Sequence, residues 1–500
     1  MQATSKNLPS VKLSLIPVLS LITLLVINVR LFGDAAIDGS IQIVLLFSTI
    51  ICVALSMWKQ QTKWHRFEAG FVKSIAGSTS AIQVLLFIGA MAGTWMLSGV
   101  IPAMIYYGLK FINPTIFLAT ACSVAAIVSV SSGSSWTTIA TIGVGLMGIG
   151  KALGIDPGWV AGAVISGGYF GDKISPLSET TNMASGVAGA DLFSHIKYLM
   201  ITTVPSFSLT LLIFLLYGFF GVEVSEVRSD ELSLALQQNY NLSPWLFIIP
   251  LVTFILIMKR VPALIVLVVG VLMGGLGVVV FQPDLCKQLV EPGLGKVQTL
   301  AKGIIQAIYG PVSITTGNEM LDSLVATKGM KGMLNTVWLI ICAMTFGGAM
   351  EASGMLKAIT DKMLGLMKNT FSTVASTSMS CMFLNLATGD QYISILLPGR
   401  MFSEAYKEKG YQPELLSRTL EDSATVTSVL IPWNSCGMAQ SAVLGVATMT
   451  YMPYCFFNIL SPIMTLIVAA IGFKIKKPIP YVEPINEEEE SELILSEAIQ

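Results

Sequence analysis

The chain has 500 residues, of which 53% are hydrophobic and only 12% are charged, with a mean hydropathy of +0.73. Soluble globular chains carry about 25% charged residues, so these values exclude an ordinary soluble fold and indicate a membrane protein. The net charge of −1 gives no field that would attract nucleic acid, and we expect no nucleic-acid partner. The seven cysteines form no CxxC or Cys/His cluster, so no zinc site is expected.

Long apolar runs predict an all-α polytopic protein with the lipid bilayer as its surroundings, because a membrane-spanning helix needs about 20 mostly apolar residues. In chain order the predicted spans are 13–31, 39–57, 80–108, 114–130, 134–152, 158–170, 196–221, 244–258, 261–281, 335–352, 370–386, 390–403, 424–447 and 452–473. Several runs are too short to cross alone or are broken by Gly, Ser and Pro, which indicates discontinuous or re-entrant helices.

The first and the least apolar segments need separate interpretation. The run at 13–31 resembles a signal peptide, but its apolar core exceeds the usual length of about 7–15 residues, so we expect a retained helix. The segments 61–78 and 283–332 are less apolar than the spans. They predict interfacial amphipathic helices, for instance at 299–309, or re-entrant pieces.

Lys and Arg in short loops predict the orientation, because such loops stay in the cytoplasm. The basic groups lie at 59–73, at Lys259–Arg260 and at 474–477. Placing all three in the cytoplasm gives a cytoplasmic N-terminus at 1–12, a first transmembrane repeat at 13–222, an external linker at 223–243, a second repeat at 244–475 and a cytoplasmic acidic tail at 476–500. We therefore expect a multi-pass protein of the inner (cytoplasmic) membrane with both termini inside.

The chain also repeats itself at an offset of roughly 255 residues. Three pairs of segments match in the same order: Ser98–Gly99 with Ser353–Gly354, Ser131–Ser135 with Ala387–Gln391, and Ser175–Leu177 with Ser428–Leu430. With the charge pattern, the first half begins inside and the second begins outside, so the halves form an inverted-topology repeat. Inverted repeats with broken helices near the bilayer midplane are typical of secondary transporters that work by alternating access.

The densest polar motif between apolar runs is Gly171–Asn182. Pro176 lacks a backbone N–H and should unwind the helix there. Carboxylates, hydroxyls and unwound carbonyls then meet, and such oxygens suit a hard cation. The candidate ligands here are Asp172, Ser175, Ser178, Glu179, Thr180, Thr181 and Asn182. The alternative is an ordinary loop with a helix cap at Ser178 or Thr180.

Three further motifs add oxygen ligands at predicted breaks. The Ser/Gly stretch Ser131–Ser135 contributes Ser134 and Ser135, although small-residue helix packing is its alternative. Its counterpart contributes Thr388 and Asp390. The segment 421–434 ends in a proline and a tryptophan before an asparagine, and its candidates are Asp422, Ser423, Thr427, Ser428 and Asn434. For Asp422 and its neighbour Glu421, the alternative is an interfacial helix start.

The energy of burying acids supports a functional interpretation. One carboxylate at the bilayer centre costs roughly 2.5–3.5 kcal/mol on insertion scales. Such residues persist where they bind a ligand or are paired, and sequence proximity suggests pairs of Asp172 with Lys173 and of Asp390 with Arg400.

The run Gly171–Asn182 resembles the signature of the NhaC-type sodium/proton antiporters of the ion transporter superfamily. The stretch Leu420–Gly437 is similar to that family's second motif, and the resemblance extends over about residues 70–475. It implies exchange of Na+ for H+, no enzymatic activity, and no cofactor beyond the transported ions. The family usually carries Asp where this chain has Glu179, which keeps the charge on a longer arm.

The same family contains malate/lactate exchangers, so small organic acids are the alternative cargo. Lys173, Arg400 and Arg418 are available to bind their carboxylates. A remote alternative is an intramembrane aspartyl protease, because the Gly-Asp pair occurs at both Asp172 and Asp390; a channel is another. Ion selectivity, stoichiometry and oligomeric state stay open.

The expected mechanism is competition between Na+ and H+ for one site. Burial favours the protonated form of a carboxylate, whereas a bound cation favours the ionised form. The residues expected to ligate Na+ are Asp172, Ser175, Thr181, Asp390 and Thr427.

Overall fold

The computed structural model describes residues 8–32, 39–221, 226–317 and 319–475. These residues form helices joined by turns and loops, and the one strand-like feature among them is an isolated bridge between Val312 and Thr327. The predicted all-α fold is therefore confirmed. The acidic tail at 476–500, the first seven residues and the start of the predicted external linker lie outside the described residues.

Within the described ranges, seven helical segments are long and apolar enough to cross a membrane. They are α1 (Val11–Phe32), α2 (Ser40–Gln60), α4 (Thr79–Leu97), η3 with α6 (Pro114–Ser132), α11 (Leu192–Phe220), α14 (Ala263–Phe281) and α17 (Gly329–Ala352). Two bent pairs raise the count to nine when each is taken as one span, with bends of 90° at Glu231–Asn239 and Pro244–Met258, and of 55° at Thr448–Tyr454 and Phe456–Ile471. The chain is therefore a multi-pass membrane protein.

The remaining helices are shorter or are placed at the breaks. In the first half they are α3 (Trp64–Gly77), α5 (Val100–Phe111), α7 (Ser135–Thr138), η4 (Ile139–Gly143), α8 (Val144–Ala152), α9 (Pro157–Ile174) and α10 (Glu179–Ala188). In the second half they are α12 (Glu226–Asn239), η5 (Pro244–Phe247), α13 (Ile248–Met258), η6 (Leu285–Gln288), α15 (Lys296–Tyr309), α16 (Glu319–Leu324), α18 (Met355–Leu364), α19 (Thr370–Thr388), α20 (Gln391–Glu408), α21 (Pro413–Leu420), η7 (Glu421–Thr425), η8 (Ser428–Leu430), α22 (Ser435–Leu444), α23 (Thr448–Tyr451), η9 (Met452–Tyr454) and α24 (Phe456–Ile471).

Three of the predicted spans are divided in the structure, among them 452–473, which bends by 55° between η9 and α24. The run 80–108 is divided into α4 and α5 at Ser98–Gly99. The run 424–447 is interrupted, as Pro432 predicted: the π-helical turn η7 ends at Thr425 and α-helix resumes only at Ser435. Pro432 has no backbone N–H to offer a helix in between. The predicted amphipathic segments 61–78 and 299–309 correspond to α3 and α15.

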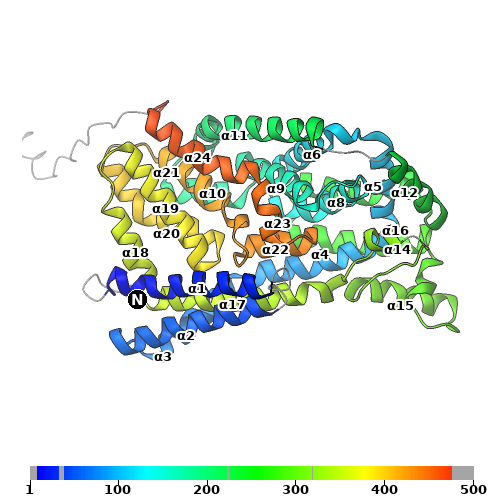
Figure 1. The fold of residues 1–500 in the computed structure, drawn as a ribbon, viewed down its shortest axis with the longest axis horizontal. Coiled ribbons are helices and arrows are strands. Elements are labelled where there is room, and N and C mark those ends of the chain that lie inside the picture. Colours follow the sequence, from blue (N-terminus) through cyan, green and yellow to red (C-terminus); the bar gives the residue numbers. More distant parts are fainter. Residues whose placement is uncertain (1–7, 33–38, 222–225, 318, 476–500) are drawn as a thin grey trace, which may run out of the picture.

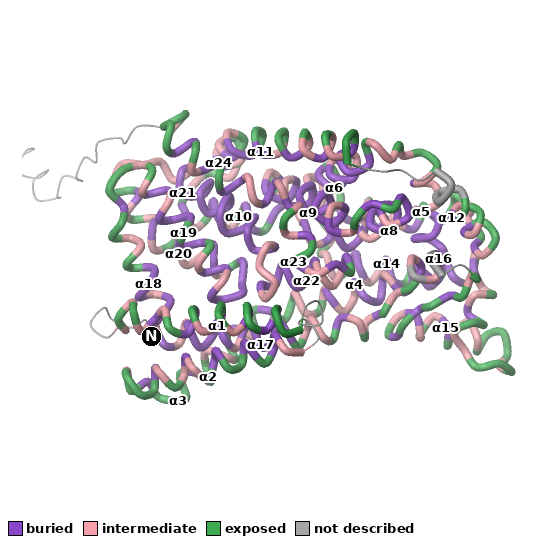
Figure 2. Tube along the Cα trace, in the orientation of Figure 1, coloured by how far each residue is buried: buried purple, intermediate pink, exposed green. Residues whose placement is uncertain are grey.

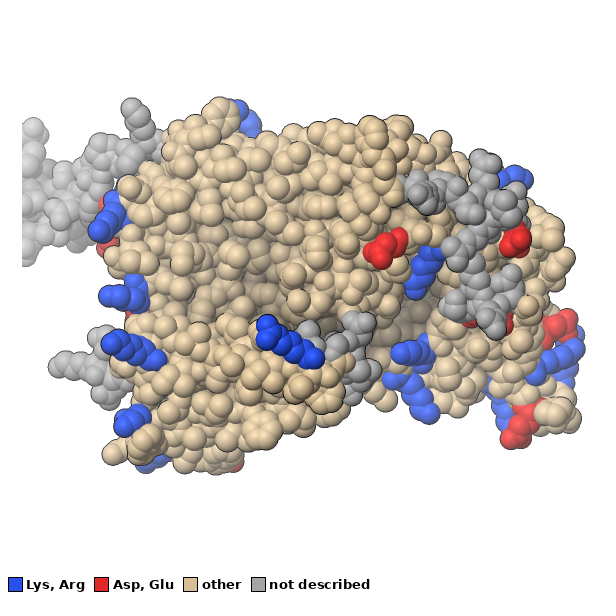
Figure 3. Space-filling view, in the orientation of Figure 1, with Lys and Arg blue, Asp and Glu red and all other residues tan. Residues whose placement is uncertain are grey.

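The helices form one elongated body in which α1, α2 and α17 run side by side, while α11 packs along α24 and α6 on another edge (Figure 1). Buried positions concentrate inside this body, and the outward faces of α2, α11 and α15 carry exposed positions (Figure 2). On α11 those exposed residues include Leu212 and Phe219. The face seen in Figure 3 shows broad areas without Lys, Arg, Asp or Glu, as expected for a surface in contact with lipid.

The packing of α6 against α9 positions the Gly171–Asn182 motif. A Cβ atom at Gly167 would lie only 2.0 Å from the carbonyl oxygen of Cys122, so only glycine permits this approach. Close contact through small residues is characteristic of helix pairs in membranes. It brings the C-terminal ends of α6 and α9 together, and both helices end at a break.

The helix breaks in the two halves have the same local geometry. Gly133 directly follows α6 and Gly389 directly follows α19, each with a φ of 66° and each donating its N–H to the carbonyl four residues earlier. The next residue caps the following helix in both cases, Ser134 for α7 and Asp390 for α20. This recurrence agrees with the predicted duplication, whereas the opposite orientation of the halves stays a prediction.

Candidate functional site

A cavity of about 350 Å³ lies where the breaks of the two halves meet. Its wall is formed by the start of α4, the α6–α7 break, the α9–α10 break, the α13–α14 turn, the α19–α20 break and the start of α22. Five of the sequence-predicted residues line it: Ser134, Asp172, Glu179, Thr180 and Asp390. Packing thus brings carboxylates from both halves of the chain, more than 200 residues apart, into one cavity.

Asp172 is held in the cavity wall by the neighbouring break. It is 6% exposed and lies in the last turn of α9. Its Oδ2 accepts hydrogen bonds from the backbone N–H of Ser135 at 3.1 Å and from the Ser135 hydroxyl at 2.7 Å. The N-terminal end of a short helix therefore stabilises negative charge on Asp172, as unsatisfied helix N–H groups generally do.

Asp390 occupies the corresponding position in the second half but is held differently. It is 9% exposed, and its Oδ1 accepts a hydrogen bond from the N–H of Ile393 at 2.7 Å, which caps α20. Its own N–H donates to the hydroxyl of Thr388 at 3.2 Å. The two carboxylates are thus fixed by backbone groups at helix ends.

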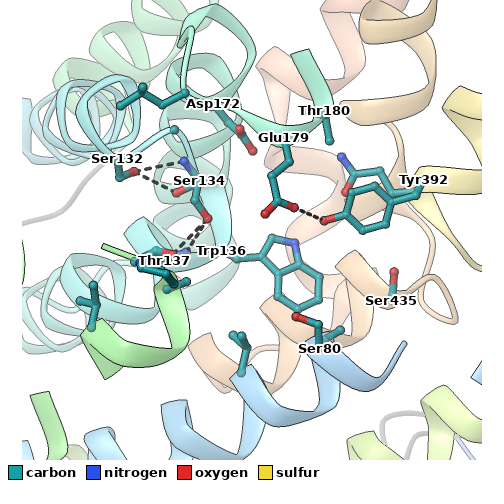
Figure 4. A pocket seen from close by; sticks show the side chains of 18 of the residues that line it. Ser80, Ser132, Ser134, Trp136, Thr137, Asp172, Glu179, Thr180, Tyr392 and Ser435 are labelled. Atoms are coloured by element: carbon teal, nitrogen blue, oxygen red, sulfur yellow. Dashed lines mark hydrogen bonds between the residues drawn. The ribbon is translucent and has the colours of Figure 1, made fainter. Parts of the chain in front are cut away.

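Glu179 is the most exposed of the three acids that line the cavity. It begins α10, and its Oε2 accepts a hydrogen bond from the hydroxyl of Tyr392 on α20 at 2.9 Å. Figure 4 shows its side chain directed toward the rings of Tyr392 and Trp136. Among the described residues, no three or more His, Cys, Asp and Glu side chains are grouped to hold a metal ion. The three acids therefore share the cavity without converging on one point.

Hydroxyl groups occupy the wall beside Asp172. Ser134 caps α7, and its Oγ accepts hydrogen bonds from the N–H of Thr137 at 3.2 Å and from its hydroxyl at 3.1 Å. Figure 4 shows Ser132, Ser134 and Thr137 grouped on one side of the cavity. Together with Thr180 they place neutral oxygen atoms near the carboxylates, which is a donor set suited to a hard monovalent cation.

The other predicted ligands lie outside the cavity wall. They are Ser135, Ser175, Ser178, Thr181, Asn182, Thr388, Asp422, Ser423, Thr427, Ser428 and Asn434. Most of their side chains fasten the breaks. Ser175 donates to the carbonyl of Val130 at 2.8 Å, and Thr181 donates to that of Lys173 at 3.0 Å. The structure does not bring Ser175, Thr181 or Thr427 into the cavity, so their role as Na+ ligands stays a prediction.

Asp422 forms a separate buried site with Lys173, and both side chains are fully buried. Asp422 accepts hydrogen bonds from Lys173, from Ser461 at 2.9 Å, from Thr202 at 2.8 Å and from Thr465 at 2.6 Å. The proposed pairing of Asp172 with Lys173 is therefore wrong, because the ammonium group points to η7 and not back along α9. No ion pair between Asp390 and Arg400 occurs among the described residues.

Several cavity residues were not selected from the sequence as ligands. They include Ser80, Arg260, Gln391, Tyr392 and Ser435. Gln391 and Tyr392 directly follow Asp390, so a wider window around that motif would have included them. Arg260 was used only to assign orientation, and nothing in its local sequence shows that the α13–α14 turn reaches the cavity.

Comparison with known proteins shows the family of this chain. The model of the Na+/H+ antiporter family matches residues 3–181 and 167–473. The chain belongs to this family. An Na(+)/H(+) antiporter NhaC of Alkalihalophilus pseudofirmus is 37% identical over 83% of this chain and 87% of its own length. An Na(+)/H(+) antiporter NhaC of Bacillus subtilis is 35% identical over 86% and 92%, and the Malate-2H(+)/Na(+)-lactate antiporter of that species is 30% identical over 92% and 94%.

Membership of the Na+/H+ antiporter family confirms the resemblance drawn from the two motifs. A member of an antiporter family is a membrane transporter and not an enzyme, which removes the intramembrane protease alternative. The two Gly-Asp pairs of that alternative lie at helix breaks, where Asp172 accepts hydrogen bonds from Ser135 and Asp390 caps α20.

Proposed function

We propose that this antiporter exchanges Na+ for H+ across the cytoplasmic membrane by alternating access. The observation that carries the proposal is the shared cavity, in which buried Asp172 and Asp390 come from equivalent breaks of the two halves. The NhaC relatives, which cover most of this chain, support Na+ and H+ as the exchanged ions.

The exchange rests on competition at Asp172. With Na+ present, the ionised carboxylate and neighbouring hydroxyls such as Ser134 and Thr180 ligate the ion. Without it, burial favours the protonated carboxyl group. Because the ionised group is required for Na+ and the neutral group carries H+, the site holds one cargo at a time. Ser135 assists Na+ binding by stabilising the ionised form.

Access from the cytoplasm follows from the turn that completes the cavity. Arg260 lines the cavity, and the Lys259–Arg260 turn is assigned to the cytoplasm by its charge. The conformation described here is then the one that loads from inside, with both termini on the same side. A reporter fused after residue 500 tests this orientation, since activity of a periplasm-specific reporter would contradict it.

Malate and lactate are the second candidate cargo, supported by the relative that exchanges them. Of the cations proposed to bind their carboxylates, Lys173 is paired with Asp422, and neither Arg400 nor Arg418 lines the cavity. Arg260 does line it, and it is the residue to which an organic acid would bind.

A flux assay tests the proposal. Proteoliposomes containing a pH-sensitive dye are exposed to an Na+ gradient, and the same vesicles are then tested with malate and lactate. Asp172→Asn is expected to lower Na+-dependent proton flux at least about 100-fold, because the amide neither releases a proton nor supplies charge for the ion. The control is Asp361→Asn, an exposed residue of α18, which should keep normal flux. Unimpaired exchange by Asp172→Asn would discard the role of this residue.

A further inference from the structure

The cavity is much larger than a site for one metal ion requires. Its volume of about 350 Å³ corresponds to roughly twelve water molecules at about 30 Å³ each. Pockets that hold small organic ligands begin at about 300 Å³. The cavity therefore has room for an organic ion of several heavy atoms in addition to, or in place of, Na+.

The charge of the wall decides the sign of such a ligand. Asp172, Glu179 and Asp390 line the cavity, and the one basic side chain among its lining residues is Arg260. The ion-paired Lys173 lies outside the wall, so it does not offset the acids. With all groups ionised the lining carries two more negative charges than positive ones, and such a wall attracts a cation and repels a dicarboxylate.

Two aromatic side chains supply a second, independent form of cation recognition. Trp136 on α7 and Tyr392 on α20 both line the cavity, and Figure 4 shows both rings next to the Glu179 carboxylate. Aromatic rings attract organic ammonium groups, Trp more strongly than Tyr or Phe. This attraction adds to that of a nearby acid. A small hydrated metal ion gains little from such a wall.

We propose that the cavity also binds a small organic ammonium ion, whose charged nitrogen lies between Glu179 and the rings of Trp136 and Tyr392. The inference rests on the proposed function in that it uses the same cavity. The ammonium group donates a hydrogen bond to Glu179, and its alkyl chain occupies the space that Na+ leaves. Na+ and the organic ion then compete for Asp172 and its neighbours.

Direct binding to the purified full-length protein in lipid nanodiscs tests the inference separately from transport. The probe is radiolabelled 1,4-diaminobutane, and the opposite-charge control is radiolabelled succinate, which has the same four-carbon chain. Equilibrium dialysis is expected to show saturable binding of the diamine, displaced by Na+, and no saturable binding of succinate. Trp136→Leu should weaken diamine binding about 2- to 30-fold through loss of the cation–π contact.

The matched control is Trp245→Leu, because Trp245 in η5 is 69% exposed and does not line the cavity. It should bind the diamine as the parent does. Absence of diamine binding, equal binding by Trp136→Leu and the parent, or preferential binding of succinate would each overturn the inference. If the inference is overturned but proteoliposomes still exchange Na+ for H+, the proposed function stands. If the diamine binds but no Na+-dependent flux occurs, the inference stands and the proposed function fails.

Discussion

Replacing Lys173 by methionine is expected to destabilise the protein strongly, because it leaves Asp422 without its counter-charge. Both side chains are fully buried, so water cannot replace the ammonium group. Breaking a buried pair from one side generally costs about 3–5 kcal/mol. The hydroxyls of Thr202, Ser461 and Thr465 continue to donate to Asp422, so we expect the lower end, about 3 kcal/mol.

This cost converts to a measurable shift in melting temperature. At about 2.1 cal/mol/K per residue, a chain of 500 residues has an unfolding entropy of about 1 kcal/mol/K, so about 3 kcal/mol corresponds to about 3 °C. The assay is thermal unfolding of the purified protein in detergent, followed by size-exclusion chromatography. The matched control is Lys287→Met, which removes an exposed pair with Asp284 and should leave the melting temperature unchanged.

The double variant Lys173→Met with Asp422→Leu distinguishes stability lost through an unpaired charge from stability lost through poorer packing. Replacing a whole buried pair by apolar side chains is often neutral, so most of the lost stability should return. If the double variant is less stable than Lys173→Met alone, or if Lys173→Met melts with the parent, the reasoning about the unpaired carboxylate is refuted.

Two further predictions concern the break between α6 and α7. Ser135→Ala removes the 2.7 Å hydrogen bond from the Ser135 hydroxyl to Asp172. Because hydrogen bonds to charged groups contribute about 1.5–3 kcal/mol, the half-saturating Na+ concentration for exchange should rise about 10- to 100-fold. An unchanged concentration would show that Asp172 does not ligate Na+ in its ionised form. Gly133→Ala places a Cβ 2.6 Å from Leu177 at a φ of 66°, so the melting temperature should fall, whereas Gly186→Ala, where a Cβ meets nothing within 4 Å, should leave it unchanged.

The sequence predicted where the helices break and which acids lie at the breaks. Pro176 and the Ser/Gly stretch act locally, through a missing N–H and a flexible backbone, and α9 indeed ends at Ile174 while α6 ends at Ser132. Asp172 and Asp390 were selected because acids between apolar runs are costly, and both line the cavity. These features depend on neighbouring residues, which a single sequence contains.

The contacts between distant segments were not predictable in the same way. Lys173 pairs with Asp422, 249 residues away, although Asp172 is its direct neighbour. Successive residues of a helix point in directions about 100° apart, so adjacent side chains at the end of α9 face different surroundings. Which surroundings they meet depends on how α9 packs against η7 and α24, and sequence spacing does not encode that packing.

The two adjacent residues at the end of α9 indicate which parts of the protein move together during alternating access. Asp172 faces the cavity, whereas Lys173 ties α9 to η7, and Asp422 also binds Thr202 of α11 and Thr465 of α24. Separating these four elements would break this buried ion pair and its hydrogen bonds, at a cost of several kcal/mol. They should therefore move as one body. The elements expected to move relative to this body during exchange are α4 and the α13–α14 turn, which form the rest of the cavity wall. No ion pair among the described residues joins them to that body.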